Sequence, residues 1–99
     1  MYGTIFNLDV KPEHHEALIK SLQDQETWPD GSIAFFVMHP DQGEGLVGIV
    51  VFESKEAYMS NADSREQHQR FLEMMEHLAS EPTWTDGTYV VGKILKEPI

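Results

Sequence analysis

Segments with strand-like and helix-like hydrophobic periods follow one another along this 99-residue chain as strand, helix, strand, strand, helix, strand. No repeat, linker or low-complexity tract interrupts that order, and a chain of this length has no room for a second core. We therefore expect one domain over residues 1–99, in which each of two crossovers contains a helix.

The first half of the chain predicts a strand, a helix and a hairpin. Residues 2–10 alternate between apolar and polar side chains toward their end, as a half-buried strand does. Pro12 suits the first position of a helix that runs to about Gln25, because its missing N–H costs nothing there. Residues 32–39 and 46–52 then form two strands joined by a loop, and the second has the β-branched run of a central strand.

The second half of the chain contains the strongest helical period. It lies between Ser64, which matches a capping box with Gln67, and Pro82, which ends it. A shorter helix, capped by Ser54 and ending near Met59, precedes it. The apolar stripe of the longer helix is made of His68, Phe71, Leu72, Met75, Leu78 and Ala79.

The end of the chain predicts the fourth strand. Asp86-Gly87 has the composition of a turn, and Thr88–Leu95 is strand-like with an interruption at Gly92. The fold class expected is α+β with ferredoxin-like βαββαβ topology, a four-stranded antiparallel sheet and its helices on one face. The other sheet face would be apolar and uncovered, so a second copy of the chain is its natural cover.

Charge and composition exclude several classes of protein. Seven Lys and Arg residues stand against 17 Asp and Glu residues, and the net charge of −10 disfavours binding to nucleic acid or to anionic membranes. The absence of cysteine excludes disulfides, thiolate metal sites and cysteine nucleophiles. Residues 1–10 have neither a basic region nor a long apolar run, so we expect a cytoplasmic protein without signal peptide or membrane span.

Three segments resemble the antibiotic-biosynthesis monooxygenase family. Phe6–Glu13 is similar to its first strand and helix start, Val51–Tyr58 to the end of its third strand, and Ser64–Phe71 to the segment that follows. The resemblance implies a dimeric α/β barrel, a homodimer whose sheets pack face to face with a pocket between helices and sheet. It also implies cofactor-independent oxygenation of aromatic polyketides or quinols, haem degradation in one branch, or a binding or stress-responsive role without a reaction.

The haem-degrading branch differs from this chain at two positions. That branch has an Asn in the first strand and a Trp in the second helical region. Alignment on Val10-Lys11-Pro12 puts Phe6 at the Asn position and turns Asn7 to the opposite face, while Asn61 stands at the Trp position. Haem degradation is therefore disfavoured, and no cofactor is expected.

His68 is the candidate catalytic residue. A neutral imidazole near a helix N-terminus could accept a proton from a phenolic substrate, but a half-packed histidine bonded to backbone fits the same position. Candidate lining residues of a pocket for a flat ligand are Trp28, Phe36, Tyr58, Asn61, Phe71, Met75 and Trp84. The aromatic members of this set fit a core or a subunit interface equally well.

The histidine spacing predicts no metal site. His68 and His77, nine residues apart, lie on opposite sides of a helix, and His14 and His15 diverge. His39 stands alone at a strand end, and His77 is expected to pair with Glu73.

Three functions remain open. The first is a cofactor-independent monooxygenase acting on an aromatic or quinone-like small molecule, with His68 as base. The second is a non-catalytic, ligand-binding or stress-associated dimeric barrel, and the third is a purely structural homodimer. An open cavity faced by His68 and a second polar group favours the enzyme, and a cavity without convergent polar groups favours the binding protein.

Overall fold

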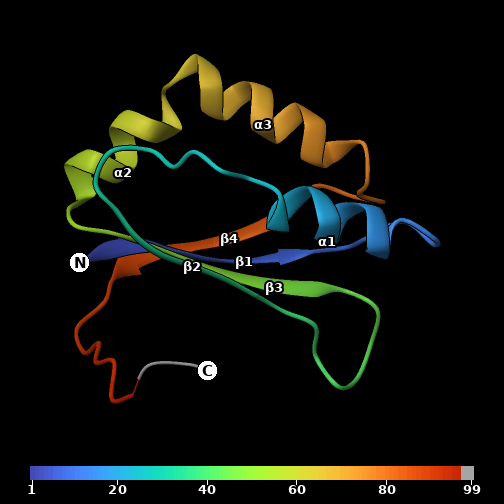
Figure 1. Ribbon diagram of the computed structural model, residues 1–99, viewed down its shortest axis with the longest axis horizontal. Helices are drawn as coiled ribbons and strands as arrows, with labels where there is room; N and C mark the ends of the chain where they lie inside the picture. Colours follow the sequence, from blue (N-terminus) through green and yellow to red (C-terminus); the bar gives the residue numbers. More distant parts are fainter. Residues whose placement is uncertain (97–99) are drawn as a thin grey trace.

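The computed structural model describes residues 1–96, which form one antiparallel sheet with helices on one side (Figure 1). The strands are β1 (Tyr2–Leu8), β2 (Ser32–Met38), β3 (Leu46–Phe52) and β4 (Thr83–Thr88), in the sheet order β2-β3-β1-β4. The helices are α1 (His15–Gln23), α2 (Lys55–Ala62) and α3 (Arg65–Met75). The α+β, ferredoxin-like arrangement and the central position of β3 are both confirmed.

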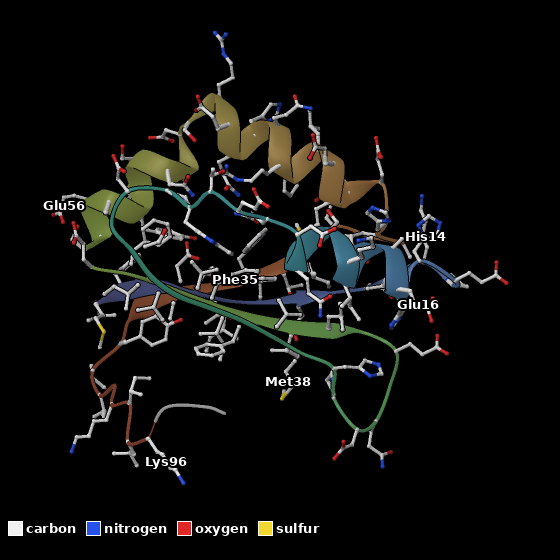
Figure 2. The ribbon with its side chains drawn as sticks, viewed as in Figure 1. His14, Glu16, Phe35, Met38, Glu56 and Lys96 are labelled. Carbon is white, nitrogen blue, oxygen red and sulfur yellow. The ribbon has the colours of Figure 1, made fainter. Side chains whose placement is uncertain are left out.

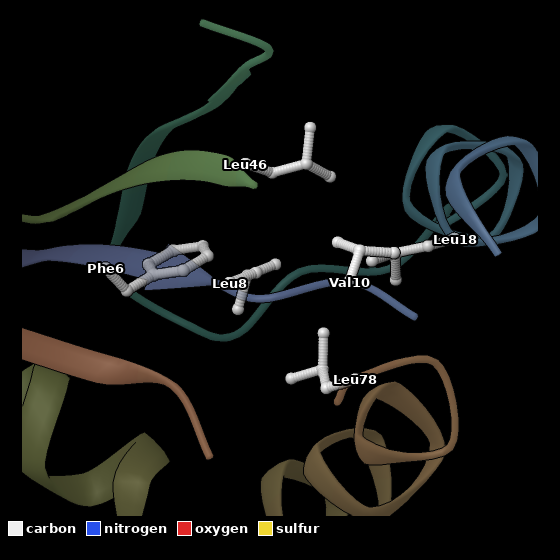
Figure 3. Packing of buried hydrophobic residues seen from close by; sticks show 6 residues of the cluster. All are labelled: Phe6, Leu8, Val10, Leu18, Leu46 and Leu78. Carbon is white, nitrogen blue, oxygen red and sulfur yellow. The ribbon is translucent and has the colours of Figure 1, made fainter. Parts of the chain in front are cut away.

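The core lies between the sheet and α1. Every second side chain near the end of β1 points into this core, because successive side chains of a strand point to opposite faces of the sheet. Its buried members are Phe6, Leu8, Val10, Leu18, Leu46 and Leu78 (Figure 3). Leu18 is the contribution of α1 and is almost fully buried. Burying each such side chain stabilises the folded state by roughly 1.5–3 kcal/mol relative to leaving it exposed. This small cluster therefore supplies much of the free energy that stabilises the fold.

Serine caps start α2 and α3, as the sequence predicts. The hydroxyl of Ser54 accepts a hydrogen bond from the Ala57 backbone N–H, and that of Ser64 from the Gln67 backbone N–H, each at 3.1 Å. Such a cap satisfies one of the N–H groups that the first helical turn leaves without a partner. α2 continues to Ala62, past its predicted end.

The prediction that the first helix begins at Pro12 was wrong. Glu13 has a φ of +69°, in the left-handed region, and a right-handed helix cannot pass through that conformation. The helix therefore begins at His15, and it ends at Gln23 rather than near Gln25.

The prediction that the longer helix continues to Pro82 was also wrong, because α3 ends at Met75. The chain then turns toward the end of β1, where Leu78 forms an isolated β-bridge with Val10. Leu78 is buried, as its place in the apolar stripe suggested, but it reaches the core from non-helical backbone.

The last strand lies earlier in the sequence than predicted. β4 covers Thr83–Thr88, so Asp86-Gly87 is paired with β1 and is not a turn. Residues 90–95, predicted as strand, are not in a strand. The pairing between β4 and β1 ends at this point: the Tyr89 N–H donates to the Met1 carbonyl at 2.9 Å, and no described strand lies beside residues 90–95.

The sheet face opposite the helices is open in the single chain. Phe36 and Met38 project from it and are 56% and 57% exposed, and Figure 2 shows Met38 pointing away from the helices. Residues 90–95 also lie on this side of the sheet, opposite the helices (Figure 1). The uncovered apolar face expected from the sequence is therefore present.

Candidate functional site

Four aromatic rings form a row across the helix side of the sheet, which we call the aromatic row. Neighbouring ring centroids are 5.2 Å apart for Trp28 and Phe35, 6.4 Å for Phe35 and Phe6, and 5.3 Å for Phe6 and Trp84. Phe6 in the middle is buried, whereas Trp28 and Trp84 at the two ends are 46% and 44% exposed. The row therefore offers an accessible indole at each end, and such rings are suited to stacking a flat molecule.

A hollow of about 490 Å³ lies beside Trp28, within the size range of small-molecule sites. The segment 27–31, which leads into β2, lines one part of the hollow, and mostly polar residues of α2, α3 and their flanking positions line the rest. Gly31, with a φ of +83°, lets this segment approach α2 closely, since an added Cβ would lie only 2.7 Å from the Cβ of Ala57. The hollow thus depends on a glycine at the end of the loop.

A polar network joins α2 to α3 in the wall of the hollow. Nη2 of Arg70 donates to Oδ1 of Asn61 at 3.3 Å, and Nε of Arg70 donates to Oε1 of Gln67 at 3.4 Å. The Asn61 amide also donates to Oε1 of Gln67, at 3.3 Å. Gln67 therefore does not complete the capping box predicted with Ser64, because its side chain is turned toward Asn61 and Arg70.

Arg70 has no carboxylate partner in the described part of the chain. Within residues 1–96, the one ion pair between a Lys or Arg and a carboxylate is Lys20–Asp24 at 2.8 Å. The carboxylates of Asp30, Glu53 and Glu66 also line the hollow, yet none of them comes within 4.0 Å of the guanidinium. Sequence reasoning missed Arg70, because its neighbours come from α2 and from one turn earlier on α3.

Tyr58 links α2 to β4 outside this hollow. Its hydroxyl donates to Oδ1 of Asp86 at 3.0 Å, and its ring packs against Tyr2 and Phe52 with centroids 5.4 and 5.6 Å away. Burial, followed by the hydrogen bond to Asp86 and the charge of that carboxylate, raises the pKa of Tyr58 to about 12. Tyr58 is therefore a neutral hydrogen-bond donor at physiological pH.

Only some of the pocket-lining residues predicted from the sequence lie together in the structure. Trp28 and Asn61 line the hollow, and Trp84 lies at the far end of the aromatic row. Phe36 projects from the opposite sheet face. Two further candidates, Phe71 and Met75, are half-buried on α3, and Met75 packs against the core.

His68, the predicted base, is exposed on α3 and does not line the hollow. Within residues 1–96 its side chain makes no hydrogen bond. The placement of His68 therefore differs from the inward orientation on which its catalytic role was based.

The other four histidines form two pairs. Nδ1 of His14 lies 3.1 Å from Nδ1 of His77, and the His15 ring packs edge-on against His39 with centroids 5.4 Å apart. The divergence of His14 and His15 is confirmed. The prediction that His77 pairs with Glu73 on a helix was wrong because α3 ends before His77, and His39 does not stand alone. Residues 1–96 contain no group of three or more His, Asp or Glu side chains arranged to hold a metal ion.

Comparison with known proteins identifies the fold. No family profile matches the sequence, and no curated protein matches it. A protein from Nitrosomonas europaea, provisionally described as an antibiotic biosynthesis monooxygenase, superimposes with a TM-score of 0.76 at 15% identity, over 92% of this chain and 100% of its own. A similarly described protein from Chloroflexus aurantiacus gives a TM-score of 0.68 at 19% identity, over 92% and 96%. This chain has the antibiotic biosynthesis monooxygenase fold.

The same monooxygenase fold includes a porphyrin-binding neighbour. A variant of MhuD, with two manganese protoporphyrin IX molecules bound per active site, gives a TM-score of 0.73 at 16% identity, over 94% of this chain and 98% of its own. The α+β, ferredoxin-like fold expected from the sequence is thus confirmed, while ligand and reaction have to be argued from this chain's own residues. None of the helices within residues 1–96 is long and apolar enough to cross a membrane.

Proposed function

We propose that this chain binds a flat aromatic or quinone-like small molecule in the hollow beside Trp28. The position of Trp28 is the observation that carries the proposal: the residue lines the hollow, and nearly half of its side-chain surface is accessible. The Trp28 ring also packs against Phe35, with ring centroids 5.2 Å apart, and this contact helps to hold the indole in place. A flat ligand could stack on the accessible face while polar groups of α2 and α3 fix its orientation.

Cofactor-independent oxygenation is a second candidate function for the same hollow. The monooxygenase fold favours it, and the reaction needs a base that removes a proton from the substrate. His68 does not line the hollow and is therefore poorly placed for this, whereas Asp30, Glu53 and Glu66 do line it. A deprotonated anthrone would reduce O₂, so that one oxygen atom becomes the new ring carbonyl and the other leaves as water with the two hydrogens of the oxidised carbon.

Haem does not fit the residues of this site. Asn7 faces away from the helices, as strand parity predicts, and pairs in register with Val47 and Thr83. Phe6, which takes the position of the first-strand Asn of the haem-degrading branch, is buried in the aromatic row. Asn61, at the position of the branch's Trp, is engaged with Arg70. We therefore do not include haem among the proposed ligands, although one structural neighbour binds a porphyrin.

We further propose that the working unit is a homodimer formed through the open sheet face. Phe36, Met38 and Ile5 are exposed there. On the same side, Val90, Val91, Ile94 and Leu95 are each more than three-quarters exposed. Burial of apolar surface stabilises an assembly by about 25 cal/mol per Å², so a second copy on this face would offset the small core of one chain.

The binding and oxygenase functions can be tested together. Fluorescence titration with quinols, naphthols and anthrones would be followed alongside oxygen uptake. We expect saturable binding that Trp28→Leu weakens at least tenfold, while Trp84→Leu, at the other end of the aromatic row, changes it little. Oxygen uptake that Glu53→Gln or Glu66→Gln abolishes would establish the oxygenase, and binding without uptake would leave the binding function. No saturable binding by any of these compounds would refute both.

A further inference from the structure

We propose that the ligand of the hollow is an aromatic carboxylate, and that Arg70 is the residue that selects its anionic group. The proposal rests on the binding function proposed above and adds the chemical class of the ligand. It starts from one observation: a half-buried guanidinium lies in the wall of the hollow and has no carboxylate within 4.0 Å among residues 1–96.

Burial makes this observation informative. Most Lys and Arg residues within 1–96 lack a carboxylate partner, but they are exposed and keep their hydration, whereas Arg70 is half-buried. A partly buried cation loses hydration, and that loss is compensated best by a hydrogen-bonded anion. The carboxylate of a ligand in the hollow would supply this compensation by hydrogen bonding to the guanidinium of Arg70.

The neighbours of Arg70 position the guanidinium and leave its charge in place. Asn61 and Gln67 accept hydrogen bonds through neutral amide oxygens, so neither cancels the positive charge. These two bonds use Nε–H and one hydrogen of Nη2, which leaves three of the five N–H donors. The remaining donors belong to the Nη1 and Nη2 end of the group, the fork that binds a carboxylate through two parallel hydrogen bonds.

The acidic residues of the hollow narrow the ligand class further. Asp30, Glu53 and Glu66 repel any anionic group in the hollow, so a ligand can carry a charge only where contact with Arg70 offsets that repulsion, but these carboxylates can accept hydrogen bonds from hydroxyl groups. Trp28 adds a surface for stacking a ring. The ligand that matches all of these contacts is a hydroxylated aromatic acid with a single carboxylate.

Calorimetric titration at pH 7 with three related naphthalenes tests the proposal. The probes are 1-hydroxy-2-naphthoate, its methyl ester and 1-naphthol, which share the ring system and differ in the anionic group. We expect the acid to bind the wild-type protein at least tenfold more tightly than the ester or the naphthol. Salt at 500 mM should weaken binding of the acid alone, because its contact with Arg70 is the charged one.

Variants of Arg70 assign the selectivity to this residue. Arg70→Gln should lower the affinity for the acid far more than the affinity for the ester, so that the difference between the two probes is lost, while Arg70→Lys should keep part of the difference. Arg65→Gln removes the same charge from an exposed position of α3 that does not line the hollow, and it should preserve the wild-type selectivity.

The outcomes separate this inference from the function on which it rests. Equal binding of acid, ester and naphthol by the wild-type protein would overturn the anion selectivity and leave the aromatic-binding function standing. Selectivity that survives in Arg70→Gln would overturn the assignment to Arg70. Absence of binding by all three probes would overturn both proposals. The comparison of acid with ester in the wild-type protein needs no variant, so it holds even if a substitution impairs folding.

Discussion

Gly48 lies directly opposite Phe6 in the β1–β3 pair, and the missing side chain of Gly48 makes room for the Phe6 ring. A Cβ on Gly48 would overlap that ring. Phe6 is also the buried centre of the aromatic row, with Phe35 on one side and Trp84 on the other. A glycine in the third strand therefore determines how the centre of the aromatic row is packed.

Gly48→Ala should destabilise the fold by about 1–3 kcal/mol, the usual range for overpacking a filled core. Urea unfolding monitored by circular dichroism measures the loss. Gly87→Ala is the matched control, because Gly87 lies in the same sheet and an added Cβ there would meet nothing within 4 Å. The control should change stability by less than about 0.5 kcal/mol, and equal losses in the two variants would show that the Phe6 contact is not the cause.

Tyr58 should make stability depend on alkaline pH. Its pKa is raised to about 12 in the folded protein, whereas the phenol of the unfolded chain ionises near 10.0. The folded state therefore holds this proton more tightly, and the stabilisation is fully present below pH 10 and is lost as the pH rises through 12. In urea titrations between pH 9 and 12, Tyr58→Phe should lose stability less steeply than the wild-type protein.

Tyr2→Phe provides the comparison for Tyr58, because the Tyr2 ring packs on Tyr58 and makes no hydrogen bond to Asp86. This variant should retain the steep alkaline loss of the wild-type protein. A Tyr58→Phe variant with the same pH profile as the wild type would contradict the role assigned to the Tyr58–Asp86 hydrogen bond.

Substitution of the two capping serines should have similar effects on stability but different effects on ligand binding. Ser54→Ala and Ser64→Ala should each cost about 1 kcal/mol of stability, measured by thermal unfolding. Ser64 accepts from the backbone N–H of Gln67, whose side chain holds Arg70, so Ser64→Ala should also weaken binding of 1-hydroxy-2-naphthoate. Ser54→Ala should leave that affinity unchanged, and an equal effect of both variants on binding would argue against the network.

The homodimer should depend on the open sheet face. Phe36→Glu combined with Met38→Glu introduces charge there and should give a folded monomer in sedimentation velocity at micromolar concentration. Leu72→Glu makes a similar change at an exposed position of α3, on the helix side, and should remain dimeric. A wild-type protein that sediments as a stable monomer would refute the dimer.

Much of the fold could be predicted from local patterns. Alternation along residues 2–10 identifies the buried face of β1, and the β-branched run of residues 46–52 identifies a central strand. Ser54 and Ser64 mark the two helix starts correctly because capping is an interaction between residues three apart. These features need no information from elsewhere in the chain.

The errors arose where distant contacts decide the conformation. Residues 90–95 have strong strand propensity, but a strand also needs a neighbour, and no described strand lies beside them. Leu78 fits a helical stripe, yet its bridge to Val10 takes it out of the helix. The site was only half predicted for the same reason, since Trp28 and Asn61 were identifiable by type but the position of Arg70 follows from how α2 and α3 meet.

The central claim is that an aromatic ligand binds beside Trp28, and fluorescence quenching of single-tryptophan variants by 1,4-naphthoquinone tests it most directly. Trp84→Phe leaves Trp28 as the reporter, and Trp28→Phe leaves Trp84; the two indoles are 46% and 44% exposed, so random collisions should quench them alike. We expect saturable quenching when Trp28 is the reporter and only weak, linear quenching when Trp84 is. Linear quenching of the same strength in both variants would contradict the claim.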